Sequence, residues 1–297
     1  MRLCSNLGFT LVAMFAVLAV AMPARGALIA AYGFENATNR LQDGTGNGNT
    51  LVQNSTDTPI QFINSPVQNG FYYFELGDTV AYSPAVDTNR YLKVPDAVYP
   101  KDPISGTGGS FTFAGLVCPS SGGGWRTILS SDKFRFTFRV GQSGGTSIDS
   151  LHLGVWNAAG TGLSNANSNV GTAVPDTWYF AALRYDHVAG KVDGFLQDAS
   201  GAWNPLTVGL SGSSVPASFN TMSSLALGFN VKSVPTVSGA DAFAGMMDNV
   251  QFYTTALSDA ELEARFFQLA VPEPSSVMLL LAAGGLMFLP YRRRRGR

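Results

Sequence analysis

Three tryptophans of this chain lie in or beside segments rich in glycine and asparagine, where a side chain can stay open to solvent: Trp125, Trp156 and Trp203. A flat aromatic ring beside amide and carboxylate groups is a surface on which a sugar can stack, with the polar neighbours supplying hydrogen bonds. Trp203, followed by Asn204 and Pro205, is the first candidate for such a platform. The alternative for each tryptophan is packing in the core or at a sheet edge.

A second candidate site is the segment Asp43-Gly44-Thr45-Gly46-Asn47-Gly48-Asn49, which is dense in oxygen atoms. Calcium binds several oxygens from carboxylates, amides and backbone carbonyls. Calcium is therefore the cofactor that this segment could hold, with Asp43 and Asn47 as candidate ligands. The same residue types also form loops without a metal, because Asp, Asn and Gly tolerate turn geometry. The sequence leaves both interpretations open.

Residues that could catalyse a reaction are sparse. Glycoside hydrolysis needs two carboxylates on one face, about 5 to 10 Å apart. Besides Glu273 the chain has four glutamates, and none is paired on an expected strand: Glu35, Glu75, Glu261 and Glu263. The two histidines, His152 and His187, lack ligand spacing to each other and are expected to be structural or solvated. We therefore expect no enzyme activity, and a glycoside hydrolase is the least favoured function.

Residues 271–297 form a distinct C-terminal segment, in which Pro272, Glu273 and Pro274 precede an apolar run. Residues 275–291 would measure roughly 25 Å as a helix, the short end of what spans a membrane. A cluster of arginines follows and would keep that end in the cytoplasm by the positive-inside rule: Arg292, Arg293, Arg294, Arg295 and Arg297. The prolines favour extended backbone, which a processing enzyme can bind. A plain tail anchor is the alternative.

This order of motif, short membrane helix and arginine cluster resembles the PEP-CTERM sorting signal of bacterial envelope and extracellular-matrix proteins. The resemblance implies processing by an exosortase-type transpeptidase in the inner membrane. It also implies a transient membrane anchor and a final place at the cell surface or in the extracellular matrix.

Residues 1–26 are typical of a signal peptide. Arg2 begins a short positive region, residues 7–22 are almost wholly apolar, and Ala24-Arg25-Gly26 offers small residues to a signal peptidase. Cleavage after Gly26 would make Ala27 the new N-terminus. An uncleaved N-terminal anchor is the alternative.

The segment between the two signals, residues 27–270, is long enough for one domain with a single core. From Ala27 to Val271 the chain has twelve basic and nineteen acidic residues, a net charge of about −7. An acidic chain without a basic cluster argues against nucleic acid and anionic membrane surfaces as partners. Cys4 leaves with the signal peptide, so Cys118 has no partner for an intramolecular disulfide and is expected to be buried.

Short runs rich in β-branched and aromatic residues, separated by Gly, Asn, Ser and Pro, predict an all-β sandwich. The expected strands are 28–34, 72–76, 110–117, 127–129, 134–140, 151–156, 178–185, 192–196, 225–229 and 245–253. Within 134–140, apolar residues alternate with Arg135 and Arg139, which places both arginines on one sheet face. We expect unpacked loops at 39–58, 141–150 and 199–216, and a hairpin loop at Gly122-Gly123-Gly124.

One segment, residues 258–269, predicts a helix. Ser258 can cap it, Glu261 completes a capping box, and an apolar stripe follows.

Several of these segments together resemble the LamG-like type of concanavalin A-like jelly roll. They are the opening strand Leu28–Glu35, the strand Ser110–Pro119, the central strand Asp176–Asp186, the closing strand Phe243–Tyr253 and the helix start Ala256–Leu262. The resemblance implies a jelly-roll β-sandwich with one short C-terminal helix. We expect Trp178 and Tyr185 in the sandwich core, Gly245 at a close sheet-on-sheet approach, and backbone partners for Asp248-Asn249.

Two functions of different classes remain open. The first is an exported, non-catalytic recognition module that binds glycans, such as a polysaccharide, or other matrix components. The second is a structural or self-associating surface protein without a small ligand. Saturable ligand binding by a monomer favours the first, and concentration-dependent assembly without ligand favours the second.

Overall fold

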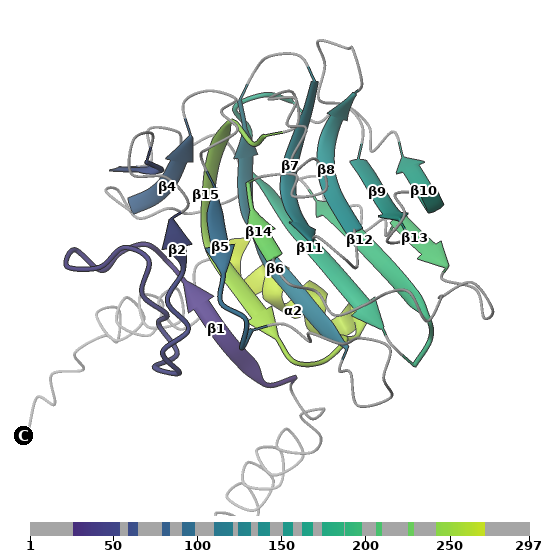
Figure 1. Ribbon diagram of the computed structural model, residues 1–297, viewed down its shortest axis with the longest axis horizontal. Coiled ribbons are helices and arrows are strands. Elements are labelled where there is room, and N and C mark those ends of the chain that lie inside the picture. Colours follow the sequence, from purple (N-terminus) through teal and green to yellow (C-terminus); the bar gives the residue numbers. More distant parts are fainter. Residues whose placement is uncertain are drawn as a thin grey trace, which may run out of the picture.

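A computed structural model describes residues 26–53, 59–64, 79–83, 91–98, 110–120, 124–131, 136–142, 151–156, 162–168, 174–186, 188–197, 206–209, 225–228 and 242–270. The predicted signal peptide, apart from Gly26, and the C-terminal segment 271–297 lie outside these ranges. The described residues form antiparallel strands in two sheets and one helix, α2 (Asp259–Ala270) (Figure 1). No helix within those ranges is long and apolar enough to span a membrane.

The eight-stranded sheet contains the strands that the resemblance identified. Its order is β13-β12-β11-β6-β15-β4-β3, and β1 pairs with β15 outside this path. The strands are β1 (Leu28–Tyr32), β3 (Gln61–Asn64), β4 (Thr79–Ser83), β6 (Phe111–Pro119), β11 (Tyr179–Asp186), β12 (Lys191–Gln197), β13 (Leu206–Gly209) and β15 (Gly245–Tyr253).

The seven-stranded sheet has the order β10-β9-β8-β7-β14-β5-β2 and lies over the first sheet (Figure 1). Its strands are β2 (Val52–Gln53), β5 (Leu92–Val94), β7 (Gly124–Ser131), β8 (Phe136–Gln142), β9 (Leu151–Trp156), β10 (Gly162–Ser168) and β14 (Leu225–Leu227). The chain passes from β6 in one sheet to β7 in the other, so the glycine run at 122–124 does not lie in a hairpin as predicted. Gly124 is the first residue of β7, and Gly122 and Gly123 lie outside the described residues.

The sandwich core lies between the two sheets. Phe113 of β6 and Phe252 of β15 meet with ring centroids 5.6 Å apart, and Phe138 of β8 enters from the other sheet. Tyr185 is buried in this cluster, as predicted. Burying an aromatic or aliphatic side chain of this size stabilises the fold by about 1.5 to 3 kcal/mol.

A second apolar layer lies on the opposite face of the eight-stranded sheet, beneath α2. Every residue of β6 is buried, because Val117 faces the sandwich core while Leu116 and Cys118 face this layer. Trp178 also lies here, with Phe266 of α2, so it is buried as predicted but not in the sandwich core. Cys118 is a buried free thiol, which confirms the sequence expectation.

Helix α2 begins with the predicted capping box. The hydroxyl of Ser258 accepts a hydrogen bond from the backbone N–H of Glu261 (3.3 Å), and the Glu261 carboxylate accepts one from the backbone N–H of Ser258 (2.8 Å). Leu262 and Phe266 then pack against the sheet. The polar first turn and the apolar stripe together explain why this segment is helical.

Three sequence expectations about loops and glycine need correction. The described part of the segment 39–58, residues 39–53, does pack, because Leu51 is buried and β2 begins at Val52. The expected loop 199–216 contains β13. At Gly245 (φ +138°) a Cβ atom would lie 2.2 Å from the carbonyl oxygen of Cys118, so the close approach joins two strands of one sheet rather than two sheets.

Candidate functional site

Trp125, Arg139 and His152 come together on three neighbouring strands of the seven-stranded sheet. The register pairs Arg139 of β8 with His152 of β9, and Trp125 of β7 with Gly141 of β8. The guanidinium carbon of Arg139 lies 4.2 Å from the centroid of the Trp125 ring. The rings of Trp125 and His152 lie 5.0 Å apart at an interplanar angle of 49°. We call these three residues the Trp125 cluster.

The period of the strands explains why these side chains share one face. On β8, Phe138 and Val140 enter the core, so Arg139 between them faces the other way. On β9, Leu151 and Leu153 do the same for His152. The prediction that Arg139 lies on the face opposite the aromatic residues is confirmed, whereas Arg135 lies outside the described residues.

A glycine allows β7 to lie close to β8 at the tryptophan. Gly141 has φ +114°, and a Cβ atom there would lie 2.4 Å from the carbonyl oxygen of Gly124 and 3.2 Å from Cα of Trp125. A side chain at position 141 would therefore push β7 away. A register shift between Thr127 and Leu129 also changes the pairing on this strand.

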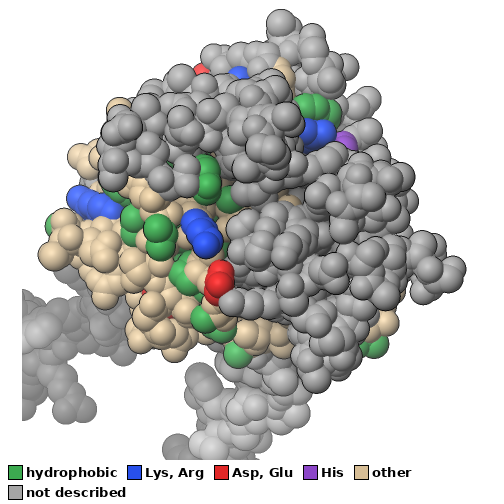
Figure 2. Space-filling view, viewed as in Figure 1, with side chains coloured by type: hydrophobic (Ala, Val, Ile, Leu, Met, Phe, Trp, Pro, Cys, Tyr) green, Lys and Arg blue, Asp and Glu red, His purple; other side chains and the backbone are tan. Residues whose placement is uncertain are grey.

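Hydrogen bonding holds the arginine within the Trp125 cluster. Nε of Arg139 donates to Nδ1 of His152 (3.1 Å), so Nδ1 acts as the acceptor and carries no proton. The stacked guanidinium gains a cation–π interaction with the indole. His152 is 5% exposed, while Trp125 and Arg139 are half-buried. The visible face in Figure 2 shows hydrophobic, basic and histidine atoms side by side at the upper right.

The predicted sugar platforms have different outcomes. Trp125 is half-buried beside a cation, and the structure brings it together with His152, a residue that the sequence indicated as structural or solvated. Trp156 ends β9, but its side chain is not described. Trp203 and His187 lie outside the described residues. The sequence held one signal for the cluster. His152 lies between two apolar residues on one strand and Arg139 lies between two on the next, so both side chains should lie on the face away from the core.

Asp43 forms the centre of the loop that follows β1. Its Oδ1 accepts hydrogen bonds from the backbone N–H groups of Ala31 (3.0 Å) and Thr45 (2.9 Å), and its Oδ2 accepts one from the N–H of Asn49 (3.3 Å). The Thr45 hydroxyl donates to the same carboxylate at 2.8 Å. Burial alone would raise the pKa of Asp43, but these hydrogen bonds outweigh it and lower that pKa.

Asn47, the other candidate calcium ligand, turns its amide nitrogen to the carbonyl oxygen of Ile29 (3.0 Å). The side-chain amide of Asn49 donates to that oxygen as well (2.9 Å). These contacts fasten the loop to β1. In the described part of the chain, no group of three or more His, Cys, Asp or Glu residues lies together as a metal site would require. Calcium binding at Asp43 and Asn47 stays a prediction.

Other polar groups hold the fold together. Arg184 of β11 pairs with the fully buried Asp193 of β12 (Nη2 to Oδ2, 2.6 Å) and donates to the carbonyl oxygen of Leu257 (2.8 Å). The carboxylate of Asp248 accepts the backbone N–H of Asn249 (2.7 Å), which confirms the expected backbone partner of Asp248, whereas the side-chain amide of Asn249 donates to the same carboxylate (3.2 Å). The positive φ of Asn249 (49°) coincides with a register shift between β15 and β6.

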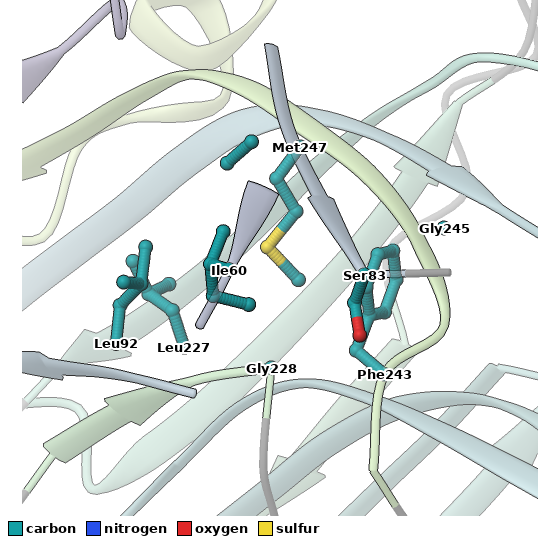
Figure 3. Close-up of a pocket in the computed structure, with 9 residues that line it drawn as sticks. Ile60, Ser83, Leu92, Leu227, Gly228, Phe243, Gly245 and Met247 are labelled. Atoms are coloured by element: carbon teal, nitrogen blue, oxygen red, sulfur yellow. The ribbon is translucent and has the colours of Figure 1, made fainter. Parts of the chain in front are cut away.

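An apolar pocket lies at one end of the sandwich, between the two sheets. It has about 290 Å³ of empty space, part of it open to solvent. Ala81 and Met247 line it from one sheet and Leu92 and Leu227 from the other, and Ile60 lies beside Met247 (Figure 3). Among the described residues that line this pocket, Ser83 alone has a polar side chain.

Comparisons with known proteins agree with this fold. Residues 86–263 match a laminin G-type family described as the concanavalin A-like lectin/glucanases superfamily, and residues 270–295 match the PEP-CTERM protein-sorting motif. Both resemblances seen in the sequence are thereby confirmed. No curated protein matches the chain at a significant level.

Several solved structures share the fold. Domain 4 of AbnA, an extracellular arabinanase of Geobacillus stearothermophilus solved with arabinotriose, is 17% identical with a TM-score of 0.52 over 82% of this chain and 98% of that domain. The binding domain of botulinum neurotoxin DC, solved with rat synaptotagmin II, is 14% identical with a TM-score of 0.53. That match covers 82% of this chain and 52% of the neurotoxin domain, so the chain spans about half of it.

Proposed function

Because the chain belongs to the concanavalin A-like lectin/glucanases superfamily and ends in a PEP-CTERM sorting motif, we propose that it is an exported, non-catalytic recognition module that binds glycans or other matrix components. The observation that carries this proposal is the Trp125 cluster. The half-buried indole of Trp125 supplies an apolar surface for a sugar, and the half-buried guanidinium of Arg139, which the buried His152 holds in place, lies against it. Its structural neighbours include a domain solved with arabinotriose, which supports the same class of ligand.

The surroundings of the three buried carboxylates in the described part of the chain support a non-catalytic role. Asp43 accepts hydrogen bonds from its own loop, Asp193 is paired with Arg184, and Asp248 accepts from Asn249. A carboxylate that acts as an acid or base must reach a substrate atom. All three instead hold strands and loops in place.

The C-terminal segment bears on where in the cell the protein is located. A PEP-CTERM motif implies export and processing by an exosortase-type enzyme, with the expected helix 275–291 as a transient anchor. Pro272, Glu273 and Pro274 would be the residues that this enzyme recognises. The N-terminal segment 1–26 would first direct the chain through the inner membrane and be removed by signal peptidase.

The proposal is tested by glycan-array binding of the full chain, purified in a non-ionic detergent without a sugar head group. We expect saturable binding of a subset of glycans by a chain that sedimentation shows to be monomeric. Repeating the array with millimolar calcium and with chelator tests the calcium prediction. Concentration-dependent assembly without binding to any glycan would instead support the alternative of a self-associating surface protein.

A further inference from the structure

Strand β1 is an edge of the eight-stranded sheet. Among the described strands it pairs with β15 alone, and it lies at the margin of the sheet (Figure 1). Natural edge strands avoid pairing with another chain through charged side chains, prolines, bulges or a covering loop. The five residues of β1 include no charged residue and no proline. Protection of this edge therefore depends on a bulge and on the loop that follows the strand.

Ile29 is the extra residue of the bulge. The register of β1 on β15 shifts between Leu28 and Ala30, so Ile29 between them lies opposite no residue of β15. Its carbonyl oxygen accepts hydrogen bonds from the side-chain amides of Asn47 (3.0 Å) and Asn49 (2.9 Å). The loop thus satisfies the backbone group that the bulge leaves out of the ladder.

Ala31 directs both of its backbone hydrogen-bonding groups to the same loop. Its N–H donates to Oδ1 of Asp43 (3.0 Å), and its carbonyl oxygen accepts the backbone N–H of Gly44 (2.7 Å). In an antiparallel sheet, a residue of a neighbouring strand would make this same pair of bonds, accepting one and donating the other. Asp43 and Gly44 therefore occupy the positions that a partner strand would take.

The loop is itself held in place on β1. The carboxylate of Asp43 also accepts the backbone N–H groups of Thr45 (2.9 Å) and Asn49 (3.3 Å), and the Asp43 side chain is buried. The hydroxyl of Tyr32, the last residue of β1, donates to the carbonyl oxygen of Asn49. A second strand could reach the edge of β1 only after these contacts had been broken.

We propose that the segment Asp43–Asn49 is an edge guard, which covers a strand edge that would otherwise pair with β1 of a second copy of this chain. Two copies of β1 can meet antiparallel about a twofold axis, because Ala31 of each copy would then exchange its N–H and carbonyl bonds with Ala31 of the other. The edge guard keeps the chain monomeric at high concentration. This inference is independent of glycan binding and goes beyond the proposed function.

The test compares the full-length wild type with a triple variant that lacks the edge guard contacts: Asp43→Ala, Asn47→Ala and Asn49→Ala. Sedimentation in a non-ionic detergent that matches the density of the buffer measures the dissociation constant of the dimer. We expect the triple variant to dimerise at least about tenfold more tightly than the wild type, the change that one pair of backbone hydrogen bonds produces.

The matched control replaces three polar side chains just before the edge guard: Asn36→Ala, Asn39→Ala and Gln42→Ala. Asn36 bonds to Gln42, and Asn39 accepts the backbone N–H of Leu41, so these contacts stay within residues 36–42 and do not involve β1. The control chain should remain as monomeric as the wild type.

Hydrogen exchange of the peptide that contains β1 identifies the surface that pairs. In the wild type, Asp43 should protect the Ala31 amide to the same degree at every protein concentration. In the triple variant, the amides of β1 should exchange faster in dilute solution and become protected again as the dimer forms. Protection that returns with concentration would place the new contact at β1.

Several results would overturn the inference. One is a folded triple variant that is as monomeric as the wild type, and another is self-association that leaves the β1 amides unprotected at high concentration. Equal self-association of the triple variant and the control would also contradict it. If the triple variant does not fold, Asp43→Asn takes its place, and a folded Asp43→Asn chain with the wild-type dissociation constant would equally exclude an edge guard.

Discussion

Arg184 and Asp193 form a buried ion pair in which Nε (2.8 Å) and Nη2 (2.6 Å) of the arginine both contact Oδ2 of the aspartate. The Nη1 of Arg184 also donates to the carbonyl oxygen of Leu257 and to Asp259 at the start of α2. One side chain therefore connects β11, β12 and the C-terminal helix. The Arg184 guanidinium also lies over the Phe195 ring, at 5.2 Å.

Asp193→Asn should destabilise the protein by about 3 kcal/mol, because it removes the buried carboxylate of the pair and leaves Arg184 only the exposed carboxylate of Asp259. Urea unfolding followed by tryptophan fluorescence measures this change. Asp259→Asn is the control, since the Asp259 side chain is 63% exposed and its loss should cost less than about 1 kcal/mol. Equal effects of the two substitutions would show that the buried pair with Asp193 contributes no more than the exposed pair with Asp259.

Asp43→Asn should destabilise the protein by about 2 kcal/mol, because the new amide presents N–H groups to donors that need an acceptor. The folded state lowers the pKa of Asp43, so its stabilising effect is present above the unfolded pKa and is lost as pH falls through the folded one. The difference in unfolding free energy between wild type and Asp43→Asn should therefore shrink below about pH 4. A difference that stays constant down to strong acid would contradict this.

Calcium should leave the thermal midpoint of the chain nearly unchanged, because the Asp43 oxygens already accept hydrogen bonds and Asn47 directs its nitrogen to Ile29. The measurement is a thermal melt with millimolar calcium and again with chelator. A rise in the midpoint with calcium that disappears in Asn47→Ala would contradict this prediction and indicate a calcium site at Asp43 and Asn47. Asn36→Ala, in the same loop region but outside Asp43–Asn49, is the control.

Cys118 should resist alkylation in the folded protein. Burial, with a smaller contribution from the negative charge of Asp176, raises the pKa of its thiol to about 12. The thiolate that reacts is therefore scarce at pH 8 until the chain unfolds. Mass spectrometry after iodoacetamide treatment, with and without urea, measures the modified fraction, and rapid labelling of Cys118 without urea would contradict its burial.

Replacing Pro272, Glu273 and Pro274 by alanine should block C-terminal processing, so that the chain stays in the membrane fraction of cells that produce an exosortase. Ser275→Ala, next to the motif, should be processed as the wild type is. The C-terminal peptide identified by mass spectrometry reports the outcome. Normal release of the triple-alanine chain would mean that another feature of residues 271–297 is recognised.

Much of the fold could be predicted because its central strands carry strong local patterns. β9 and β15 have the predicted bounds, and the capping box of α2 was visible in Ser258 and Glu261. Short or polar strands were missed. β10, with the sequence GLSNANS, has no apolar alternation and becomes a strand by pairing with β9 from Gly162 to Ser168. Tertiary pairing decides such a segment, and local propensity does not.

The candidate site was less predictable, because it depends on strand register. Arg139 and Trp125 are fourteen positions apart, and only the pairing of β7 with β8, together with Gly141, brings the guanidinium over the indole. The burial of β6 on both faces depends on α2 covering the outer face of the eight-stranded sheet. The sequence did not indicate this second apolar layer, so Trp178 was expected in the sandwich core instead. A sequence shows which face a residue occupies more readily than what lies across from it.

Glycan recognition at Trp125 is tested most directly by titrating the strongest glycan from the array into full-length wild type, Trp125→Phe and Trp125→Ala. We predict saturable binding by the monomeric wild type, partial retention in Trp125→Phe, and a loss of about tenfold or more in affinity in Trp125→Ala. Thermal midpoints within a few degrees of the wild type would show that the variants fold. Wild-type affinity in folded Trp125→Ala would contradict the account.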